Sequence, residues 1–194
     1  FFDVGQGDSI FIETENGKQI LIDGGPSNLV TQRLSEAMPF WDRTIDLVIL
    51  THTDADHLTG LLDVLKRYKV KAVLETGIEC GKPDCLAWEE AKKKEKTINL
   101  AARLGQEIIF DGNAKILILY PFEYLNGEKV SKVNNSSLVA KLIYGGTLSV
   151  PHGHAERGGY SFLFTGDIEE QVEKKLVSAG INIDSDYLKI PHHG

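Results

Sequence analysis

The histidines of this chain stand where strand ends are expected, and this placement limits the folds that the chain can adopt. All six histidines of the 194 residues lie in three short segments. Two of these segments directly follow apolar runs with the length of a buried strand, at residues 46–50 and 187–190. Layered folds hold their sites on the loops that follow strand ends. The sequence therefore indicates a layered fold with a polar site at its strand ends.

Strands and helices alternate along the chain, and one hairpin is expected near its start. An Asn-Gly turn at residues 16–17 joins strands at 9–13 and 19–22. Further strands are expected over residues 46–50, 70–74, 107–110, 116–120, 137–144, 160–165 and 187–190, and helices over 28–37, 58–68, 86–104 and 168–178. The lysine-rich stretch at 92–96 is most simply a solvated helix face. This order predicts a mixed sheet with helices on its outer faces, in a single domain covering residues 1–194.

Composition and charge narrow the functional classes. The chain is 42% hydrophobic and 25% charged, which is ordinary for a soluble globular protein. No apolar run is long enough to span a bilayer. The start lacks the basic and apolar regions of a signal peptide, and we expect the chain to be a fragment of a longer protein. Its formal net charge of -7 weakens the case for a nucleic-acid partner, although carboxylates gathered at a metal site would inflate that count.

The two cysteines, Cys80 and Cys85, flank a loop that contains a glycine and a proline. Two interpretations stand side by side. The pair closes a small disulfide, which an oxidising compartment would favour, or it is two reduced cysteines in an exposed loop. The pair alone does not supply the four ligands of a structural zinc site.

The densest polar segment is Thr51–His57, where two histidines and two aspartates fall within six positions after an apolar run. Imidazole and carboxylate ligands suit zinc, manganese or iron. In a loop after a strand, His52 and Asp54 would converge on one ion. Asp56 and His57 would then turn towards a second. Capping of the next helix by the aspartates is the alternative, and it leaves the two histidines unexplained.

Two later strand ends carry further ligand-type residues. Asp167 follows the strand at 160–165. Alone it would be a helix cap or turn residue, but together with the first cluster it is the natural carboxylate to bridge two metals. His192 and His193 follow the last strand. His192 comes first off the strand and is favoured as a ligand, while His193 would support it or point at substrate. A surface pair is the alternative.

Three other polar segments have both a functional and a structural interpretation. Asp23 leaves an apolar strand and would be costly to bury unpaired. It is expected either to hydrogen-bond the far ring nitrogen of a metal-bound histidine or to form a simple turn. Asn134, Asn135 and Ser137 either orient substrate oxygens or form a polar turn. The segment Pro151–His154 is more simply an exposed hairpin tip than a metal site, and it could also reach over the site as a lid.

Taken in order, these motifs resemble those of the metallo-β-lactamase superfamily. The resemblance rests on Asp23 with its two glycines, residues 52–57, Thr165–Asp167 and Pro191–Gly194. More narrowly, Phe2–Ser9, Thr51–His57 and Asn135–Val139 look like the hydrolase domain of ComEC-type competence proteins, which act in DNA uptake. The resemblance covers nearly the whole chain.

The resemblance implies an α+β fold, the four-layer αββα sandwich in which two mixed sheets are flanked by helices. It places the site at the edge between the sheets. It implies one or two divalent metal ions, manganese or zinc, with a metal-bound hydroxide as nucleophile. The implied metal ligands are His52, Asp54, Asp56, His57, Asp167 and His192. Asp56 and Asp167 are also implied as catalytic. The residues expected to support the ligands or contact substrate are Asp23, Asn134, Asn135, Ser137 and His193.

The chain departs from the superfamily pattern at two positions. Asp54 stands where a second histidine is usual, and Asn134 or Asn135 stands where a separate histidine usually precedes the bridging aspartate. The first metal site is therefore poorer in nitrogen, which tilts the choice towards manganese. Residues 147–159 look like an insertion relative to the family pattern.

Three functions fit these residues. The first is a metal-dependent phosphodiesterase or nuclease acting on DNA during natural transformation, for which a basic groove using Lys129, Lys132 or Lys141 is expected beside the metals. The second is a metallo-hydrolase of another ester, such as a lactone, thioester or phosphocholine ester. The third is a non-catalytic, metal-stabilised module of a DNA-uptake protein. The resemblance also implies a membrane-embedded parent protein, with this domain on the extracytoplasmic face of the membrane or secreted.

Overall fold

The fold consists of two five-stranded sheets packed face to face. The computed structural model describes residues 1–110, 112–145 and 159–191. The first sheet contains β1 (Ile10–Glu13), β2 (Gln19–Ile22), β3 (Thr44–Leu50), β4 (Lys69–Glu75) and β5 (Ile98–Ala101), in that order. The second has the order β10 (Tyr187–Leu188), β9 (Tyr160–Phe164), β8 (Val139–Tyr144), β7 (Ala114–Tyr120) and β6 (Glu107–Ile109).

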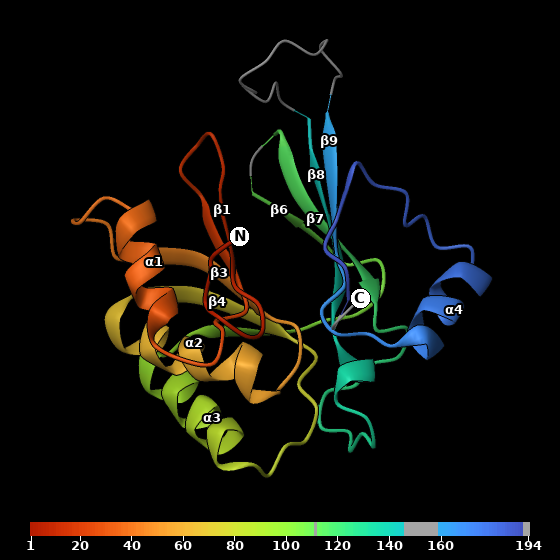
Figure 1. Cartoon of the computed structure of the whole chain (residues 1–194), viewed down its shortest axis with the longest axis horizontal. Helices are drawn as coiled ribbons and strands as arrows, with labels where there is room; N and C mark the ends of the chain where they lie inside the picture. The colour runs from red at the N-terminus through yellow and green to blue at the C-terminus, as the bar shows by residue number, and fades with distance from the viewer. Residues whose placement is uncertain (111, 146–158, 192–194) are drawn as a thin grey trace.

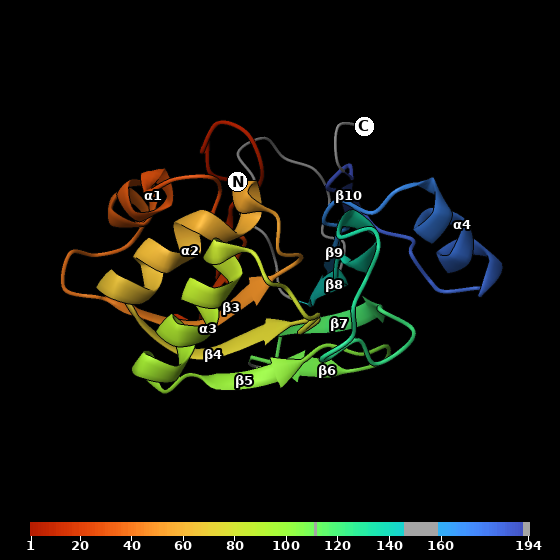
Figure 2. The same cartoon turned by 90° about the horizontal axis from the view of Figure 1, so that it is seen from below.

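Each sheet is built from one continuous half of the chain, and the two halves lie side by side (Figure 1). The helices are α1 (Leu29–Ala37), α2 (Ala55–Arg67), α3 (Pro83–Glu95) and α4 (Glu170–Ser178), with a short 3₁₀ helix η1 (Asn134–Ser136) before β8. α1, α2 and α3 cover the outer face of the first sheet, and α4 lies at the opposite end of the molecule (Figure 2).

Alternation along the strands explains the layers. In the first sheet, Leu21, Val48 and Val73 belong to the apolar core shared with α1, α2 and α3. Their neighbours in sequence face the other way, and residues such as Ile22 and Ile49 pack against the second sheet, as the two-residue period of a strand requires. A third core lies between the second sheet and α4. The order helix, sheet, sheet, helix confirms the predicted αββα sandwich of two mixed sheets.

Strand direction brings the polar loops to one edge of the sandwich. β1 and β2 form the predicted antiparallel hairpin, whereas β2, β3, β4 and β5 run parallel. In the second sheet β6 to β9 are antiparallel, and β10 runs parallel to β9. The sheets meet where Leu138 N–H donates to the Thr51 carbonyl at 2.9 Å. The loops after β2, β3 and β9 therefore lie together.

The prediction of one helix over residues 86–104 was wrong in its second half. α3 ends at Glu95 because Lys96 adopts a left-handed conformation with φ of 56°. The chain then returns as edge strand β5, which pairs with β4. The lysine-rich stretch is also not uniformly solvated. Lys92 is only 2% exposed, because its ammonium pairs with Glu75 and Glu89.

The structure corrects the expected start of α2 and decides between the two interpretations of the cysteine pair. α2 begins at Ala55, three residues earlier than expected, so Asp56 and His57 stand in the first helical turn and not in a loop. Cys80 and Cys85 form a disulfide, with 5.9 Å between their Cα atoms. No helix within the described ranges is both long enough and apolar enough to cross a membrane.

Candidate metal centre

The site is organised around Asp23, which directly follows β2 and is completely buried. Its backbone takes a left-handed conformation with φ of 58°, and its N–H donates to the Ile49 carbonyl at 2.9 Å. One carboxylate oxygen of Asp23 accepts the Thr51 N–H at 2.8 Å. The other accepts the Thr51 hydroxyl at 2.7 Å and lies 2.8 Å from His57 Nδ1. Asp23 therefore joins the ends of β2 and β3 to the first turn of α2.

These contacts fix the tautomers of both histidines. Asp23 holds the proton on His57 Nδ1, which leaves Nε2 as the nitrogen that faces the site. The Thr51 hydroxyl has only one hydrogen and gives it to Asp23. It must therefore accept from His52 Nδ1, which lies 3.0 Å away. His52 Nε2 is then left with its lone pair, so one buried carboxylate orients both imidazoles with Nε2 towards the site.

His52, His57 and Asp167 form a buried group whose ligand atoms lie within 4.8 Å of one another. His57 Nε2 lies 3.3 Å from an Asp167 carboxylate oxygen. Without a metal, this nitrogen instead faces the Asp167 carboxylate as an ion pair. Two imidazoles and a carboxylate are ligands that zinc and manganese accept. The residues present therefore fit a divalent metal ion.

The charges on the two histidines differ. Burial disfavours a charge on His57, but the negative charges of Asp23 and Asp167, and their hydrogen bonds to the His57 ring, outweigh this effect and raise its pKa to about 10. Burial and the neighbouring charge of His57 lower the pKa of His52 to about 4. Without metal at neutral pH, His57 is therefore the charged member of the pair and His52 the neutral one.

This difference predicts the proton balance of metal binding. A metal on His57 Nε2 must replace the proton that the raised pKa retains there, whereas His52 has no proton to lose. We expect about one proton to be released per ion bound near pH 7, and apparent affinity to rise about tenfold per pH unit below pH 10. Titration calorimetry in buffers of different ionisation enthalpy measures the release. Binding without proton release would remove His57 from the ligand set.

Asp54 and Asp56 lie at the edge of this group. Asp54 occupies the N-cap position of α2, but its side chain makes no cap hydrogen bond. It pairs with Lys82 Nζ at 2.8 Å and lies 3.8 Å from His52 Nε2. Asp56 is half-buried and accepts a long hydrogen bond of 3.4 Å from the Gln6 side chain.

A small cavity of about 240 Å³ joins Asp56 to the buried group. Its wall is formed by Asp56, His57, Asp167 and the N-terminal loop Gly5–Asp8. The loop approaches α2 closely: a Cβ atom at Gly7 would lie 1.9 Å from the Asp56 carbonyl oxygen. The N-terminal loop therefore forms one side of the site.

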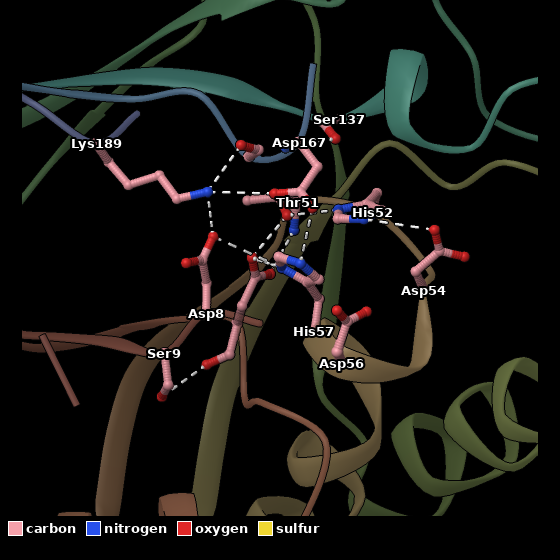
Figure 3. A network of polar contacts seen from close by, with 12 residues as sticks. Asp8, Ser9, Thr51, His52, Asp54, Asp56, His57, Ser137, Asp167 and Lys189 are labelled. Atoms are coloured by element: carbon pink, nitrogen blue, oxygen red, sulfur yellow. Dashed lines mark hydrogen bonds and ion pairs between the residues drawn. The ribbon is translucent and has the colours of Figure 1, made fainter. Parts of the chain in front are cut away.

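Sequence reasoning did not single out two residues of the site, Asp8 and Lys189. The Lys189 ammonium pairs with Asp8 and with Asp167, the latter at 3.2 Å (Figure 3). Burial raises the pKa of Asp8, an effect that Lys189 partly offsets. Asp8 was visible as part of the N-terminal motif. Lys189 had no signal beyond its place two residues before Pro191.

The remaining candidates are divided between the site and its surroundings. Ser137 is buried and its hydroxyl accepts the Asp167 N–H at 3.1 Å. The Asn135 side chain instead exchanges two hydrogen bonds with Glu169, one residue before α4, and Asn134 begins η1. The remaining four histidines lie outside the described residues. These are His152 and His154, in the segment 147–158, and His192 and His193.

The fold is an αββα sandwich, and two histidines and an aspartate lie at the edge between its sheets. This combination is the one expected of a metallo-hydrolase. The family model described as the Metallo-beta-lactamase superfamily matches residues 2–191. The chain therefore belongs to this superfamily.

Two curated relatives are similar to the chain. ComE operon protein 3 of Bacillus subtilis is 28% identical over 213 residues, which cover 99% of this chain and 25% of the relative. A protein described as UPF0173 metal-dependent hydrolase, from Thermodesulfovibrio yellowstonii, is 28% identical over 182 residues, which cover 91% of the chain and 62% of the relative. The chain thus spans less than two thirds of either relative.

Solved structures support the fold. The subclass B3 metallo-beta-lactamase MEM-A1 from a soil metagenome library is 14% identical, with a TM-score of 0.57, covering 94% of this chain and 72% of that one. LRA-12, described as a class B3 di-zinc metallo-beta-lactamase from an Alaskan soil metagenome, is 13% identical with a TM-score of 0.56, over 93% of this chain and 70% of that one. At these identities the likeness concerns the fold alone.

Proposed function

We propose that this domain is a metal-dependent phosphodiesterase that cleaves DNA during uptake. The observation that carries the proposal is the buried group of His52, His57 and Asp167, whose ligand atoms lie within 4.8 Å of one another. A divalent ion held there lowers the pKa of a water and balances negative charge on phosphoryl oxygens.

The chain's own carboxylates have separate roles in this proposal. Asp167 faces both His57 and Lys189 and acts as a ligand whose backbone Ser137 holds in place. Asp56 lies on the wall of the small cavity, where it would accept a proton from the attacking water or join the ligands. Asp54, close to His52 Nε2, and His192 complete the proposed ligand set.

Exposed lysines near the site support a polyanionic substrate. Lys82 pairs with Asp54, and Lys132 pairs with Glu169, which follows Asp167 by two positions. Lys129 is 80% exposed and pairs with Glu79. The expectation that Lys141 lines a basic groove beside the site was wrong. Lys141 is buried, and its ammonium donates to the Asp184 carbonyl. Each of the three exposed lysines, Lys82, Lys129 and Lys132, is paired with a carboxylate, so the phosphate backbone of DNA must compete with these ion pairs.

Similarity to ComE operon protein 3 supports DNA uptake as the setting. The Cys80–Cys85 disulfide supports an oxidising compartment. We therefore propose that the domain works on the extracytoplasmic face of the membrane, or as a secreted domain, as part of a membrane-embedded parent protein.

The proposal is tested with bis-p-nitrophenyl phosphate and single-stranded DNA, offered to metal-free protein and to protein with manganese or zinc. We expect turnover of both substrates that depends on metal and is lost in the double variant Asp56→Ala, His57→Ala. Absence of turnover with either metal, despite measured metal binding, would contradict the phosphodiesterase proposal.

A lysine variant separates DNA from a small diester. Replacing Lys129 and Lys132 with glutamine is expected to weaken DNA cleavage and to lower the salt dependence of DNA affinity by about one unit per lysine, with turnover of the small diester retained. The matched control replaces Lys93 and Lys94, which are exposed on α3. If the Lys129/Lys132 and Lys93/Lys94 variants weakened DNA cleavage equally, the two lysines near the site would have no specific role, and only the net charge of the protein would affect DNA binding.

One observation favours a second candidate, the hydrolysis of another ester. A pocket of about 460 Å³ adjoins His52 and Thr53 and is lined by Trp88 and the disulfide. A pocket of this kind suits a compact leaving or acyl group. Metal-dependent hydrolysis of a p-nitrophenyl carboxylic ester or a lactone, with no cleavage of either phosphodiester, would establish this candidate in place of the first.

A further inference from the structure

We propose that the loop between α1 and β3 is a membrane anchor, which inserts Phe40 and Trp41 into the surface of a bilayer that contains anionic lipids. This inference goes beyond the proposed hydrolysis and holds whether or not the metal centre cleaves phosphodiesters. The loop lies at the end of the molecule opposite α4 (Figure 1, Figure 2). Its side chains and the charges around it carry the proposal.

Phe40 and Trp41 form an apolar patch at the tip of this loop. Their side chains are 80% and 73% exposed, and their rings meet edge to face with 4.9 Å between the ring centroids. A single exposed apolar side chain is ordinary in a folded protein. Two adjacent aromatic rings held out into water instead mark an interaction surface, and aromatic side chains of this kind are enriched where proteins meet the bilayer interface.

The turn that carries the two rings is fixed by hydrogen bonds. Asp42 N–H donates to the Pro39 carbonyl at 2.9 Å. The Asp42 carboxylate accepts the Thr44 N–H at 3.0 Å and the Gln19 side-chain amide at 2.8 Å. Met38, on the other side of the rings in sequence, is buried in the core shared with the helices. Both ends of the turn are therefore anchored, and the rings are presented outward by a fixed backbone.

The topology gathers basic residues at the same end of the first sheet. β3, β4 and β5 run parallel, so the segments that lead from α1, α2 and α3 into these strands all lie at the edge where the strands begin. These segments contain Arg43, Arg67, Lys69 and Lys96, which are all exposed. The Lys69 N–H donates to the Arg43 carbonyl at 2.7 Å, which places Lys69 directly beside the aromatic loop.

The charge at this end is opposite in sign to that of the whole chain. Residues 36–46, 63–71 and 93–96 carry eight basic and five acidic side chains, whereas the chain has a net charge of -7. Arg67 and Lys69 make no ion pair with any described residue. Basic residues at helix ends also complement the helix dipole, but that effect leaves the exposed rings unexplained. Aromatic rings surrounded by basic side chains are the combination that binds anionic lipid surfaces.

Binding through this end would leave the metal centre accessible. The centre is formed by loops that follow the carboxyl ends of β2 and β3, and the aromatic loop precedes the amino end of β3. The two therefore lie at opposite edges of the first sheet. A domain held to a bilayer by Phe40 and Trp41 would present His52 and His57 away from the lipid, towards a substrate in water.

The test offers the chain vesicles of phosphatidylcholine with and without phosphatidylglycerol, and measures binding by co-sedimentation and by tryptophan fluorescence. The chain has two tryptophans, and Trp88 is completely buried, so a change on adding vesicles reports on Trp41. We expect binding to the anionic vesicles, with a blue shift of the emission and less quenching by acrylamide. Binding should weaken about tenfold or more without phosphatidylglycerol, and also at high salt.

Two variants separate the contributions of the rings and of the charges. Replacing Phe40 and Trp41 with serine is expected to weaken vesicle binding about tenfold or more, with Tm retained because both side chains are exposed. Tyr124→Ser is its control, since Tyr124 is exposed in the loop after β7. Replacing Arg67 and Lys69 with glutamine is expected to weaken binding to anionic vesicles by a similar factor. Its control replaces Lys174 and Lys175, which are exposed on α4.

Three results would overturn the proposal. The first is no binding to anionic vesicles. The second is binding that the serine variant retains in full. The third is a dimer, measured by analytical ultracentrifugation, that the serine variant loses while no vesicle binding is found, because the rings would then contact a second copy of the chain. Turnover of the small phosphodiester in the absence of vesicles should be the same in wild type and variants, so this result is independent of the test of hydrolysis.

Discussion

Asp23→Asn is expected to lower the affinity of the centre for a divalent metal about 100-fold, the upper end of the range for a residue that supports metal ligands. Asp23 accepts hydrogen bonds from Thr51 N–H, the Thr51 hydroxyl and His57 Nδ1. An asparagine offers one acceptor oxygen and a donor amide, so at least one of these contacts becomes donor against donor. Because His52 depends on Thr51 for its tautomer, both histidines are affected.

The measurement is a competitive metal titration of the wild type and the variant at one pH. Asparagine tolerates the left-handed conformation at position 23, so the backbone is expected to be retained and unfolding by urea checks it. Asp63→Asn is the matched control, since Asp63 lies on α2 and pairs with the exposed Lys66. Equal metal affinity in Asp23→Asn and wild type would show that the tautomers are not set by Asp23.

Gly60→Ala is expected to lower the free energy of unfolding by about 3 kcal/mol. Inside an exposed helix this change would stabilise by about 1 kcal/mol. Here the added Cβ would lie 1.9 Å from the Gly24 carbonyl oxygen and 2.7 Å from that of Ser27. Both are backbone atoms that cannot move without shifting the turn after β2, so the steric cost outweighs the helix propensity.

Thermal unfolding of the metal-free protein measures this effect, and a fall in Tm of roughly 6–12 °C corresponds to it for a domain of this size. Gly81→Ala is the control, because nothing lies within 4 Å of its added Cβ. It should change stability by less than about 0.5 kcal/mol. A Gly60→Ala protein as stable as the control would mean that the turn yields to α2.

The sheets and most helices could be predicted from periodicity and turn signals, because these patterns are local. The Asn-Gly hairpin and the apolar run before His52 are examples. The end of α3 could not be predicted, since the lysines and alanines around it favour a helix. The strand at residues 98–101 is stabilised by pairing with β4, a contact distant in sequence. Tertiary pairing overrides local preference there.

The site was predictable where residue chemistry alone is distinctive. Histidines and aspartates after strands pointed to His52, His57 and Asp167, and burial cost pointed to Asp23 as a partner for a histidine. The link from Asp23 through Thr51 to His52 was not predictable, because threonine is common and its role depends on the positions of three elements. Lys189 was missed for the same reason: a lone lysine just after a short strand gives no sign of the carboxylates that it will contact.

The contribution of each half of the chain to the centre has a consequence for assembly. His52 and His57 come from the half that forms the first sheet, while Asp167 and Lys189 come from the half that forms the second. Ligand binding favours the state that contains the complete site, by about 4 kcal/mol at a concentration 1,000 times the dissociation constant. A bound ion would therefore hold the halves together and keep the apolar surface between the sheets from water. During synthesis the first half alone cannot form the complete ligand group, so metal loading must wait until the second half has emerged and docked.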